Sequence, residues 1–227
     1  CYPLWRAMCL RYTLKKINRV ALPAGLNATL PAADADWTPH YNVALTSLMP
    51  VIIHQGASQL ARLSFGLTLP ARSPAQRPLI LGNARAETLL SKSSFREATL
   101  YRRCLVLADG FYEWEKQGTT RLPHYFSLKT GQGFFFAGLW SPASEQGPAA
   151  FCLVTTTPNS LLQPIHDRMP VMLGPNSGPA WLGDTPLDPS QLSRLCRPLP
   201  SEMMQSHRVD PKMNNSRYQA PDCVTPL

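Results

Sequence analysis

Short apolar segments separated by turn residues fill the middle of the chain and limit the folds that it can adopt. Segments of this length that are rich in aromatic and β-branched side chains are typical of β-strands. Asp109-Gly110, Gln117-Gly118 and Thr130-Gly131 are typical turn pairs, and they predict turns between several of the segments. The predicted strands of this region are Cys104–Ala108, Phe111–Glu115, His124–Leu128, Gly133–Trp140 and Ala149–Thr155.

The same patterns predict further strands and a few helices elsewhere. Further strands are expected at Met49–His54, Leu60–Gly66 and Leu79–Leu81. Helices are expected at Thr13–Leu22, at Glu87–Arg103 with a break near Ser91–Ser94, at Asn159–Pro164 as a single turn, and at Asp188–Cys196. The segments Pro23–Pro39 and Leu67–Pro78 are expected to be loops. This arrangement indicates an α+β fold: one compact, β-rich domain, mainly antiparallel, with a few peripheral helices.

Composition narrows the class of protein. Hydrophobic residues make up 44% of the 227 residues, which is enough for a sizeable core. The 22 Lys and Arg against 14 Asp and Glu give a formal net charge of +8, which favours an anionic partner, nucleic acid first. The six cysteines form no C-x-x-C pair and the histidines lack ligand spacing, so we expect no metal and no cofactor. Apolar runs are too short to span a bilayer, so no membrane partner is expected.

Cys9 directly follows Met8, so removal of that methionine would leave a cysteine at the amino terminus. Such a residue carries an α-amine with an ordinary pKa of about 7.7–8.0 and a thiol with an ordinary pKa of about 8.5. The amine can form an imine with an aldehyde, and the sulfur can then close a thiazolidine ring. An internal cysteine cannot do so, because its nitrogen is an amide. The Met-Cys pair is also compatible with an ordinary cysteine on a first strand.

Three positions further along the chain place polar side chains next to predicted elements. Asn83 follows a strand and opens a helix, which is also compatible with a simple helix cap. Glu113 shares a strand face with Phe111, while its two neighbours point to the other face. This carboxylate can enter a cleft or form an ion pair at the edge of a sheet. His166 lies between polar residues ahead of a strand, where an ordinary surface histidine would also fit.

The order of the motifs is more informative than any one of them. In sequence order the chain contains Cys9-Leu10-Arg11, Tyr41-Asn42-Val43-Ala44, Asn83-Ala84-Arg85-Ala86-Glu87, Asp109-Gly110-Phe111-Tyr112-Glu113-Trp114 and Ile165-His166-Asp167-Arg168-Met169-Pro170. This series resembles the SOS-response-associated peptidase (SRAP) family of abasic-site processing proteins. The resemblance extends from Cys9 to the end of the chain, where Met213-Asn214-Asn215-Ser216-Arg217 is similar to the family's closing motif.

The resemblance implies an SRAP domain over residues 9–227 that binds single-stranded DNA and crosslinks to abasic sites, protecting them in the DNA damage response. The implied catalytic residues are Cys9 as nucleophile, Asn83 as its orienting partner, and Glu113 and His166 as acid/base groups. The implied DNA-binding residues are Arg11, Asn42, Arg85, Trp114 and Arg168. Physical chemistry agrees, because an imidazole can move protons near neutral pH and arginine donors bind phosphate oxygens in pairs.

The chain also departs from the family pattern. Leu10, Leu45 and Phe65 stand where the family usually has Gly, Pro and Trp, and Leu10 is large enough to alter access to the nucleophile. Residues 1–8 are expected to be an extension that the mature protein lacks, because a peptide bond to Met8 would block the amine of Cys9. Self-cleavage before Cys9 is a second route to a free amine.

Two other interpretations use the same residues. In a cysteine-dependent peptidase or hydrolase, Cys9 would attack an acyl group with His166 as its base. In a non-catalytic binder of single-stranded DNA, Cys9 would be incidental. The expected partner is single-stranded DNA with abasic sites, and the expected state is a monomer. The expected location is cytoplasmic, with the nucleoid in a bacterium, or nuclear in a eukaryote.

Overall fold

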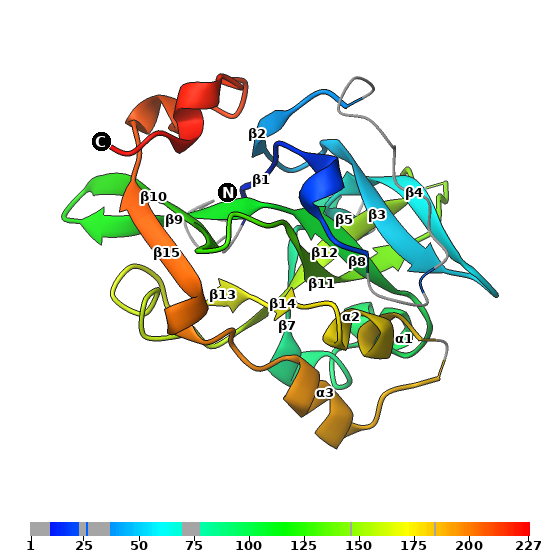
Figure 1. The fold of residues 1–227 in the computed structure, drawn as a ribbon. Coiled ribbons are helices and arrows are strands. Elements are labelled where there is room, and N and C mark those ends of the chain that lie inside the picture. Colours follow the sequence, from blue (N-terminus) through cyan, green and yellow to red (C-terminus); the bar gives the residue numbers. More distant parts are fainter. Residues whose placement is uncertain (1–9, 23–25, 27–36, 70–77, 146, 184) are drawn as a thin grey trace.

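Strands dominate the computed structural model, and helices lie at its periphery (Figure 1). The structure describes residues 10–22, 26, 37–69, 78–145, 147–183 and 185–227. In these ranges the strands form three sheets in which most pairs are antiparallel. The predicted α+β, β-rich class is therefore confirmed.

The central sheet closes on itself. β12 pairs with both β4 and β11, so the order β12-β4-β3-β8-β11 returns to its first strand as a small barrel. Two short strands, β7 and β13, also pair with β12, and β14 pairs with β11. The bounds are β3 (Leu48–His54), β4 (Ser58–Phe65), β7 (Asn83–Arg85), β8 (Arg103–Ala108), β11 (Phe134–Ser141), β12 (Ala150–Thr156), β13 (Met169–Pro170) and β14 (Met172–Leu173).

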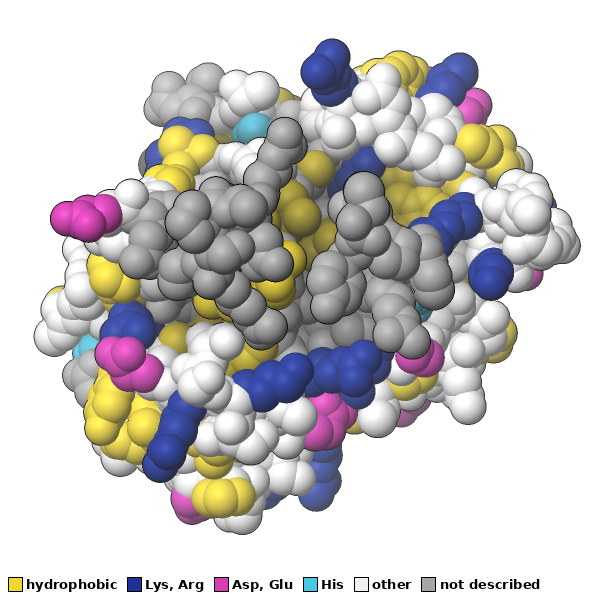
Figure 2. All heavy atoms as spheres, turned by 180° about the vertical axis from the view of Figure 1, so that it is seen from behind, with side chains coloured by type: hydrophobic (Ala, Val, Ile, Leu, Met, Phe, Trp, Pro, Cys, Tyr) yellow, Lys and Arg dark blue, Asp and Glu magenta, His cyan; other side chains and the backbone are white. Residues whose placement is uncertain are grey.

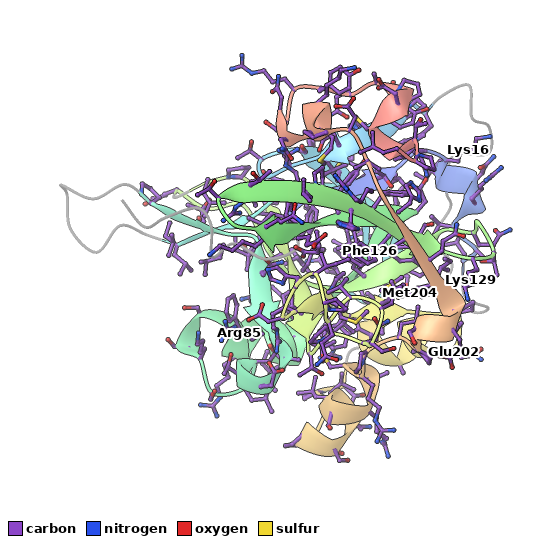
Figure 3. All side chains as sticks on the ribbon, turned by 90° about the vertical axis from the view of Figure 1, so that its left-hand side faces the viewer. Lys16, Arg85, Phe126, Lys129, Glu202 and Met204 are labelled. Atoms are coloured by element: carbon purple, nitrogen blue, oxygen red, sulfur yellow. The ribbon has the colours of Figure 1, made fainter. Side chains whose placement is uncertain are left out.

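A second sheet, called sheet A here, packs beside the barrel in the order β15-β10-β9-β1-β2. Its strands are β1 (Tyr12–Leu14), β2 (His40–Val43), β9 (Gly110–Gln117), β10 (Thr120–Leu128) and β15 (Met204–Arg208). Phe126 of β10 and Met204 of β15 belong to the main core and lie on the side of sheet A that faces the barrel (Figure 3). A two-stranded ribbon, β5 (Leu67–Leu69) and β6 (Leu79–Leu81), completes the strands.

Asp109 and Gly110 connect the barrel to sheet A, and the turn predicted there is a bend between β8 and β9. β8 pairs with β3 and β11, whereas β9 pairs with β1 and β10, and the chain only bends at Asp109. The carboxylate of Asp109 accepts hydrogen bonds from Thr13 Oγ1 (2.5 Å) and from the backbone N–H groups of Lys15 (2.6 Å) and Lys16 (3.2 Å). These bonds satisfy a buried charge and fasten β1 at the junction of the two sheets.

The helices are short. They are η2 (Ile17–Arg19), η4 (Ala86–Thr88), α1 (Ser93–Tyr101), α2 (Ser177–Leu182), α3 (Pro189–Leu195), η5 (Ser201–Met203), η6 (Pro211–Asn214) and η7 (Pro221–Val224). The predicted helix at Asp188–Cys196 is confirmed as α3, which starts with a capping box formed by Asp188 and Gln191. Across the ranges that the structure describes, the helices are too short or too polar to cross a membrane.

The helix predicted over Thr13–Leu22 is wrong, because the start of this segment is a strand. All three residues of β1 are buried, and Tyr12 meets the rings of Phe65 and Phe136 edge-on at 5.7 and 5.8 Å between centroids. Only Ile17–Arg19 forms a single 3-10 turn. Burial of a large aromatic ring outweighs the helix propensity of a few residues, which differs by less than about 1 kcal/mol per residue.

The other predictions agree with the structure in most places. The eight predicted strands are confirmed as β3, β4, β6, β8, β9, β10, β11 and β12, with ends that differ by a few residues. The helical region after Glu87 is η4 followed by α1, separated by the predicted break. A turn after Asn159 is also confirmed, since the N–H of Gln163 donates to the carbonyl of Asn159 at 2.9 Å. Leu67–Leu69, the start of the second predicted loop, is strand β5, so the loop prediction is wrong there. Most of the rest of the two predicted loops lies outside the described residues.

Candidate functional site

Cys9, the predicted nucleophile, lies outside the described residues, but its neighbour Leu10 is placed. The carbonyl of Arg11 accepts a hydrogen bond from the backbone N–H of Tyr112 at 3.0 Å, in line with the antiparallel pairing of β1 and β9. Continued by one residue on each strand, this register sets Leu10 opposite Glu113. The side chain of Leu10 also lies directly against Gly82, the residue that precedes β7. Leu10 therefore lies between the strand of Glu113 and the strand of Asn83.

Asn83 and Arg85 are held by the parallel pairing of β7 with β12. Asn83 lies beside Leu153 and Arg85 beside Thr155, and the carbonyl of Gly82 accepts from the N–H of Leu153 at 2.9 Å. Residues two apart on a strand share a face. Because the intervening Ala84 points into the core, Asn83 and Arg85 point away from it, and Arg85 is exposed at the end of the strand (Figure 3).

The loop that carries His166 leads into β13, which pairs with β12 on the edge opposite β7. β13 pairs with the end of β12, so that Thr155 lies between Arg85 on one side and Pro170 on the other. Neighbouring strands are about 4.8 Å apart, so β7 and β13 lie about 10 Å from each other across β12. The motifs around Asn83 and His166 are distant in sequence, and the end of β12 brings them together.

The imidazole of His166 has a defined arrangement. The backbone N–H of Arg168 donates to Nδ1 at 3.1 Å, so in the neutral ring Nδ1 is the acceptor and Nε2 carries the proton. The carboxylate of Asp167 lies 3.2 Å from the same Nδ1 and is largely exposed. It can accept a hydrogen bond when the ring is protonated. His166 therefore has a partner for Nδ1 in either protonation state, as a proton-transfer group requires.

Arg168 fastens this loop to the segment after β7. Its Nη1 and Nη2 donate to the two carboxylate oxygens of Glu87 at 2.7 and 2.8 Å, and Nη2 also donates to the carbonyl of Thr155 at 2.7 Å. Partial burial alone would raise the pKa of Glu87, but the hydrogen bonds and charge of Arg168 outweigh it and lower this pKa. Phosphate binding by Arg168 stays a prediction, and a phosphate would have to share this guanidinium with Glu87.

Glu113 is a buried carboxyl group on the core face of β9. Its side chain shares that face with Phe111, whose ring stacks on Phe126 at 5.1 Å, and the residue is only 2% exposed. Tyr112 points to the opposite face and packs in a second cluster with Tyr125. The predicted alternation is confirmed. Both faces of the strand are buried at this point, so Glu113 is not a solvated carboxylate at a sheet edge.

Arg11 and Asn42 bind the segment Met213–Gln219, called the C-terminal segment here. Arg11 donates to the side-chain oxygen of Asn42 and to the carbonyls of Met213 (3.2 Å) and Asn214 (2.8 Å). Burial lowers the pKa of the Arg11 guanidinium. In this structure much of its hydrogen-bonding capacity serves the protein itself, and phosphate binding by Arg11 stays a prediction.

Asn42 is fully buried, and its amide serves the same segment. Nδ2 lies within hydrogen-bond distance of the carbonyls of Met213 (2.8 Å), Asn215 (3.1 Å) and Tyr218 (3.0 Å). The backbone of Asn42 also exchanges two hydrogen bonds with the side chain of Gln219. A side chain without exposed surface makes no direct contact with DNA, so any contribution of Asn42 to DNA binding passes through the C-terminal segment.

Trp114 belongs to the same group. Its Nε1 donates to Oδ1 of Asn214 at 2.7 Å, and its ring packs against the second cluster on the face opposite Glu113. The predicted DNA-binding residues therefore form two groups. Arg85 and Arg168 lie beside β12 with Asn83 and His166, whereas Arg11, Asn42 and Trp114 hold the C-terminal segment above sheet A (Figure 1).

The three departures from the family pattern have different surroundings. A Cβ atom at Gly82 would collide with Leu10 and would lie 2.8 Å from Cδ2 of Leu45, so both leucines fill the space that this glycine leaves. Phe65 is completely buried, stacked on Phe151 at 5.2 Å between centroids. Leu10 and Leu45 thus form an apolar surface next to Asn83, whereas Phe65 is a core residue.

The motifs contained two further residues to which the sequence assigned no role. Glu87 ends the motif that begins with Asn83, and Asp167 follows His166, and both carboxylates contact predicted site residues. Their position inside the motifs was the available signal.

Within the described ranges, no group of three or more His, Cys, Asp or Glu could hold a metal ion. Seen from behind, Lys and Arg side chains form a row across the molecule (Figure 2).

Comparison with protein families gives one match, to the family described as SOS response associated peptidase (SRAP), over residues 8–216. A similar protein is "Abasic site processing protein YoqW" of Bacillus subtilis, which is 34% identical over 96% of this chain and 99% of its own. "Abasic site processing protein HMCES" of Rattus norvegicus is 27% identical over 84% of this chain and 65% of its own.

Solved structures give a matching fold. A protein from Bacteroides thetaiotaomicron superposes with a TM-score of 0.77 at 22% identity, covering 96% of this chain and all of its own. A phage-related protein from Bordetella bronchiseptica superposes with a TM-score of 0.68 at 26% identity, covering 88% of this chain and 94% of its own. The first of these likenesses concerns the fold alone.

Proposed function

This chain belongs to the SRAP family, and we propose that it processes abasic sites by forming a covalent crosslink between Cys9 and single-stranded DNA. The names of its relatives support the substrate. The observation that carries the proposal is the position of Leu10, which is covalently bonded to Cys9 and lies between Asn83 and Glu113. We propose Asn83 as the residue that orients Cys9.

The proposed reaction begins when the open-chain sugar presents its aldehyde. The α-amine of Cys9 adds to the carbonyl carbon, and loss of one water gives an imine. The thiol then adds across the carbon–nitrogen double bond, its proton passes to the nitrogen, and a thiazolidine ring closes. Glu113 accepts a proton from the α-ammonium group, returns one to the departing hydroxyl, and takes up the proton that the resulting iminium loses as the imine forms. A carboxyl that is 2% exposed keeps such exchanges away from bulk water.

His166 acts earlier in the proposed sequence. An abasic sugar is mostly a closed hemiacetal, so opening needs a proton removed from the ring hydroxyl and another delivered to the ring oxygen. The Nδ1 partners of His166 leave Nε2 as the nitrogen that exchanges protons with the sugar. Arg85, exposed beside this loop, would neutralise a neighbouring phosphate.

The decisive experiment compares chains that differ in their first residues. Protein that begins at Cys9 should form a heat- and detergent-stable adduct with single-stranded DNA containing an abasic site. Protein with residues 1–8 attached, and C9A protein, should not form it. Chemical blocking of the α-amine should abolish the adduct. A stable adduct at Cys9 in protein whose mass proves that residues 1–8 remain would refute the thiazolidine route, and amine-independent cleavage of an acyl substrate would favour a peptidase.

Two variants test the acid/base assignments. E113Q should slow formation or reversal of the adduct by about 10²–10⁴-fold, as expected for loss of acid–base assistance, with nearly unchanged DNA affinity. H166A should mainly impair reaction with ring-closed sites and should react almost normally with a small open-chain aldehyde. Equal loss on both substrates would show that His166 shapes the site without moving protons. We also propose that the mature protein is a monomer.

A further inference from the structure

A histidine that the proposed mechanism leaves unused lies directly across from Glu113. In the antiparallel pair of β9 and β10, His124 is the cross-strand partner of Glu113, and on its other side it pairs with Arg208 of β15. Directly opposite residues project from the same face, with Cβ atoms about 4.5–5.5 Å apart. The three side chains therefore form one row across sheet A, on the face that also carries Phe111 and Phe126.

His124 is held by a second carboxylate. Its Nε2 lies 3.1 Å from Oε2 of Glu115, which is two residues after Glu113 on β9. The side chain of His124 is 13% exposed and that of Glu115 is 36% exposed, against 2% for Glu113. Exposure therefore increases along the series, from a buried carboxyl through a nearly buried imidazole to a carboxylate in contact with water.

The burial of Glu113 creates a requirement that this series can meet. Conversion of the α-ammonium group, the thiol and the aldehyde into a neutral thiazolidine and one water releases one net proton, which Glu113 receives. Until that proton leaves, Glu113 can return it to the ring and reverse the closure, and Glu113 has almost no surface through which water can collect it. Bound DNA would reduce that surface further. A neutral imidazole that donates Nε2–H to Glu115 has an unprotonated Nδ1, which can accept a proton from the opposite side of the ring.

We propose that His124 and Glu115 form a proton relay that connects Glu113 with solvent. The proton of the Glu113 carboxyl passes to Nδ1 of His124, directly or through one water. The imidazolium then releases its Nε2 proton to the carboxylate of Glu115, which passes it to bulk water and is again ionised. His124 ends as the neutral ring with its proton on Nδ1. Rotation of the ring about the Cβ–Cγ bond turns Nδ1 toward solvent, where water takes this proton and supplies one to Nε2, and the ring then rotates back to the starting tautomer.

Three charged residues face His124 across sheet A: Glu113 and Glu115 from β9, and Arg208 from β15. Tyr125 and His207, the next cross-strand pair, lie on the other face of sheet A with the second cluster. His124 does not touch the reacting atoms in this scheme and acts only through Glu113. The inference thus rests on the proposed crosslinking function.

The test is a buffer-rescue experiment with H124F, which keeps an aromatic ring at a strand position. Rates of adduct formation on abasic single-stranded DNA are measured for protein that begins at Cys9, in dilute buffer and with increasing imidazole. Wild-type protein should be insensitive to imidazole. H124F should be at least about tenfold slower in dilute buffer, a part of the 10²–10⁴-fold typical of acid–base assistance, and imidazole should restore its rate. E115Q should show a smaller loss with the same rescue.

The matched control is H54F. His54 is the last residue of β3 and its side chain lies within hydrogen-bond distance of Ser58, so its replacement should leave the rate of adduct formation unchanged. DNA affinity and thermal stability of H124F show whether the fold is intact. A wild-type rate for H124F in dilute buffer, or a slow rate that no concentration of imidazole restores, would overturn the relay alone. Absence of any adduct from wild-type protein would overturn the crosslinking function, and the relay with it.

Discussion

Replacing Asn42 with alanine should loosen the C-terminal segment and lower the stability of the whole domain. The amide of Asn42 is the hydrogen-bond partner of Arg11 and of three backbone carbonyls in this segment. In N42A the carbonyl of Met213 still accepts a hydrogen bond from Arg11. The carbonyls of Asn215 and Tyr218 lose the donor that the Asn42 amide supplies.

The magnitude follows from these two losses. An unsatisfied buried polar group costs about 1–3 kcal/mol, and values at the low end apply because the segment is partly exposed and water can reach it. We therefore expect N42A to reduce the free energy of unfolding by about 2 kcal/mol. For a domain of this size each kcal/mol lowers Tm by about 2–4 °C, so Tm should fall by about 4–8 °C.

Thermal unfolding followed by circular dichroism measures this change, and hydrogen exchange locates it. N42A should show faster exchange in Met213–Gln219 and nearly normal protection in β8 and β11. The matched control is N214A, which removes only the exposed bond to Trp114 and should cost less than about 1 kcal/mol. A Tm of N42A within 2 °C of wild type, or unchanged exchange in the segment, would refute the anchoring role assigned to Asn42.

Three further changes test other contacts. The pKa of the Glu87 carboxyl is lowered in the folded state. Its contribution to stability is therefore present above the unfolded pKa of about 4.3 and is lost as pH falls through the folded value. The Tm of wild type should be higher than that of E87Q at pH 7, and the difference in Tm should close near pH 3. G82A should lower the free energy of unfolding by about 1–3 kcal/mol, because the added methyl group collides with Leu10 and Leu45. The double variant with L10G should recover part of this loss. Purely additive changes in the free energy of unfolding would contradict the packing of Leu10 against Gly82. R85A should reduce the log–log salt slope of single-stranded DNA binding by about 0.7, and a slope equal to that of wild type would remove Arg85 from the phosphate contacts.

The sequence predicts the long strands well and the short ones poorly. Strands of the barrel such as β8 and β12 are continuous apolar runs that are buried on both faces, a strong signal in a single sequence. β7 and β13 have three and two residues and exist because β12 offers them a free edge. That edge is a tertiary feature, and no local pattern encodes it.

The site shows the same division. The motifs predict candidate residues, but not how these residues are divided between the barrel and the two faces of sheet A. The sequence could not show that Arg11 bonds to residues about 200 positions away, since this depends on where the C-terminal segment packs. No local motif marks His124 in the sequence, and it lacks metal-ligand spacing. Its place opposite Glu113 depends on the register of a hairpin, which becomes visible only when both strands are paired.

The bond between Arg11 and the C-terminal segment has a consequence for synthesis of the protein. Arg11 leaves the ribosome about 200 residues before its partners Met213 and Asn214, which emerge about 10–40 s later at typical rates of translation. Until then the residue before β1 lacks its hydrogen bonds to the C-terminal segment, and β15, the edge strand of sheet A, has not yet been synthesised. A nascent or prematurely terminated chain would therefore carry Cys9, the proposed nucleophile, without the contacts that hold β1, so incomplete copies should be poor at the proposed capture of abasic DNA.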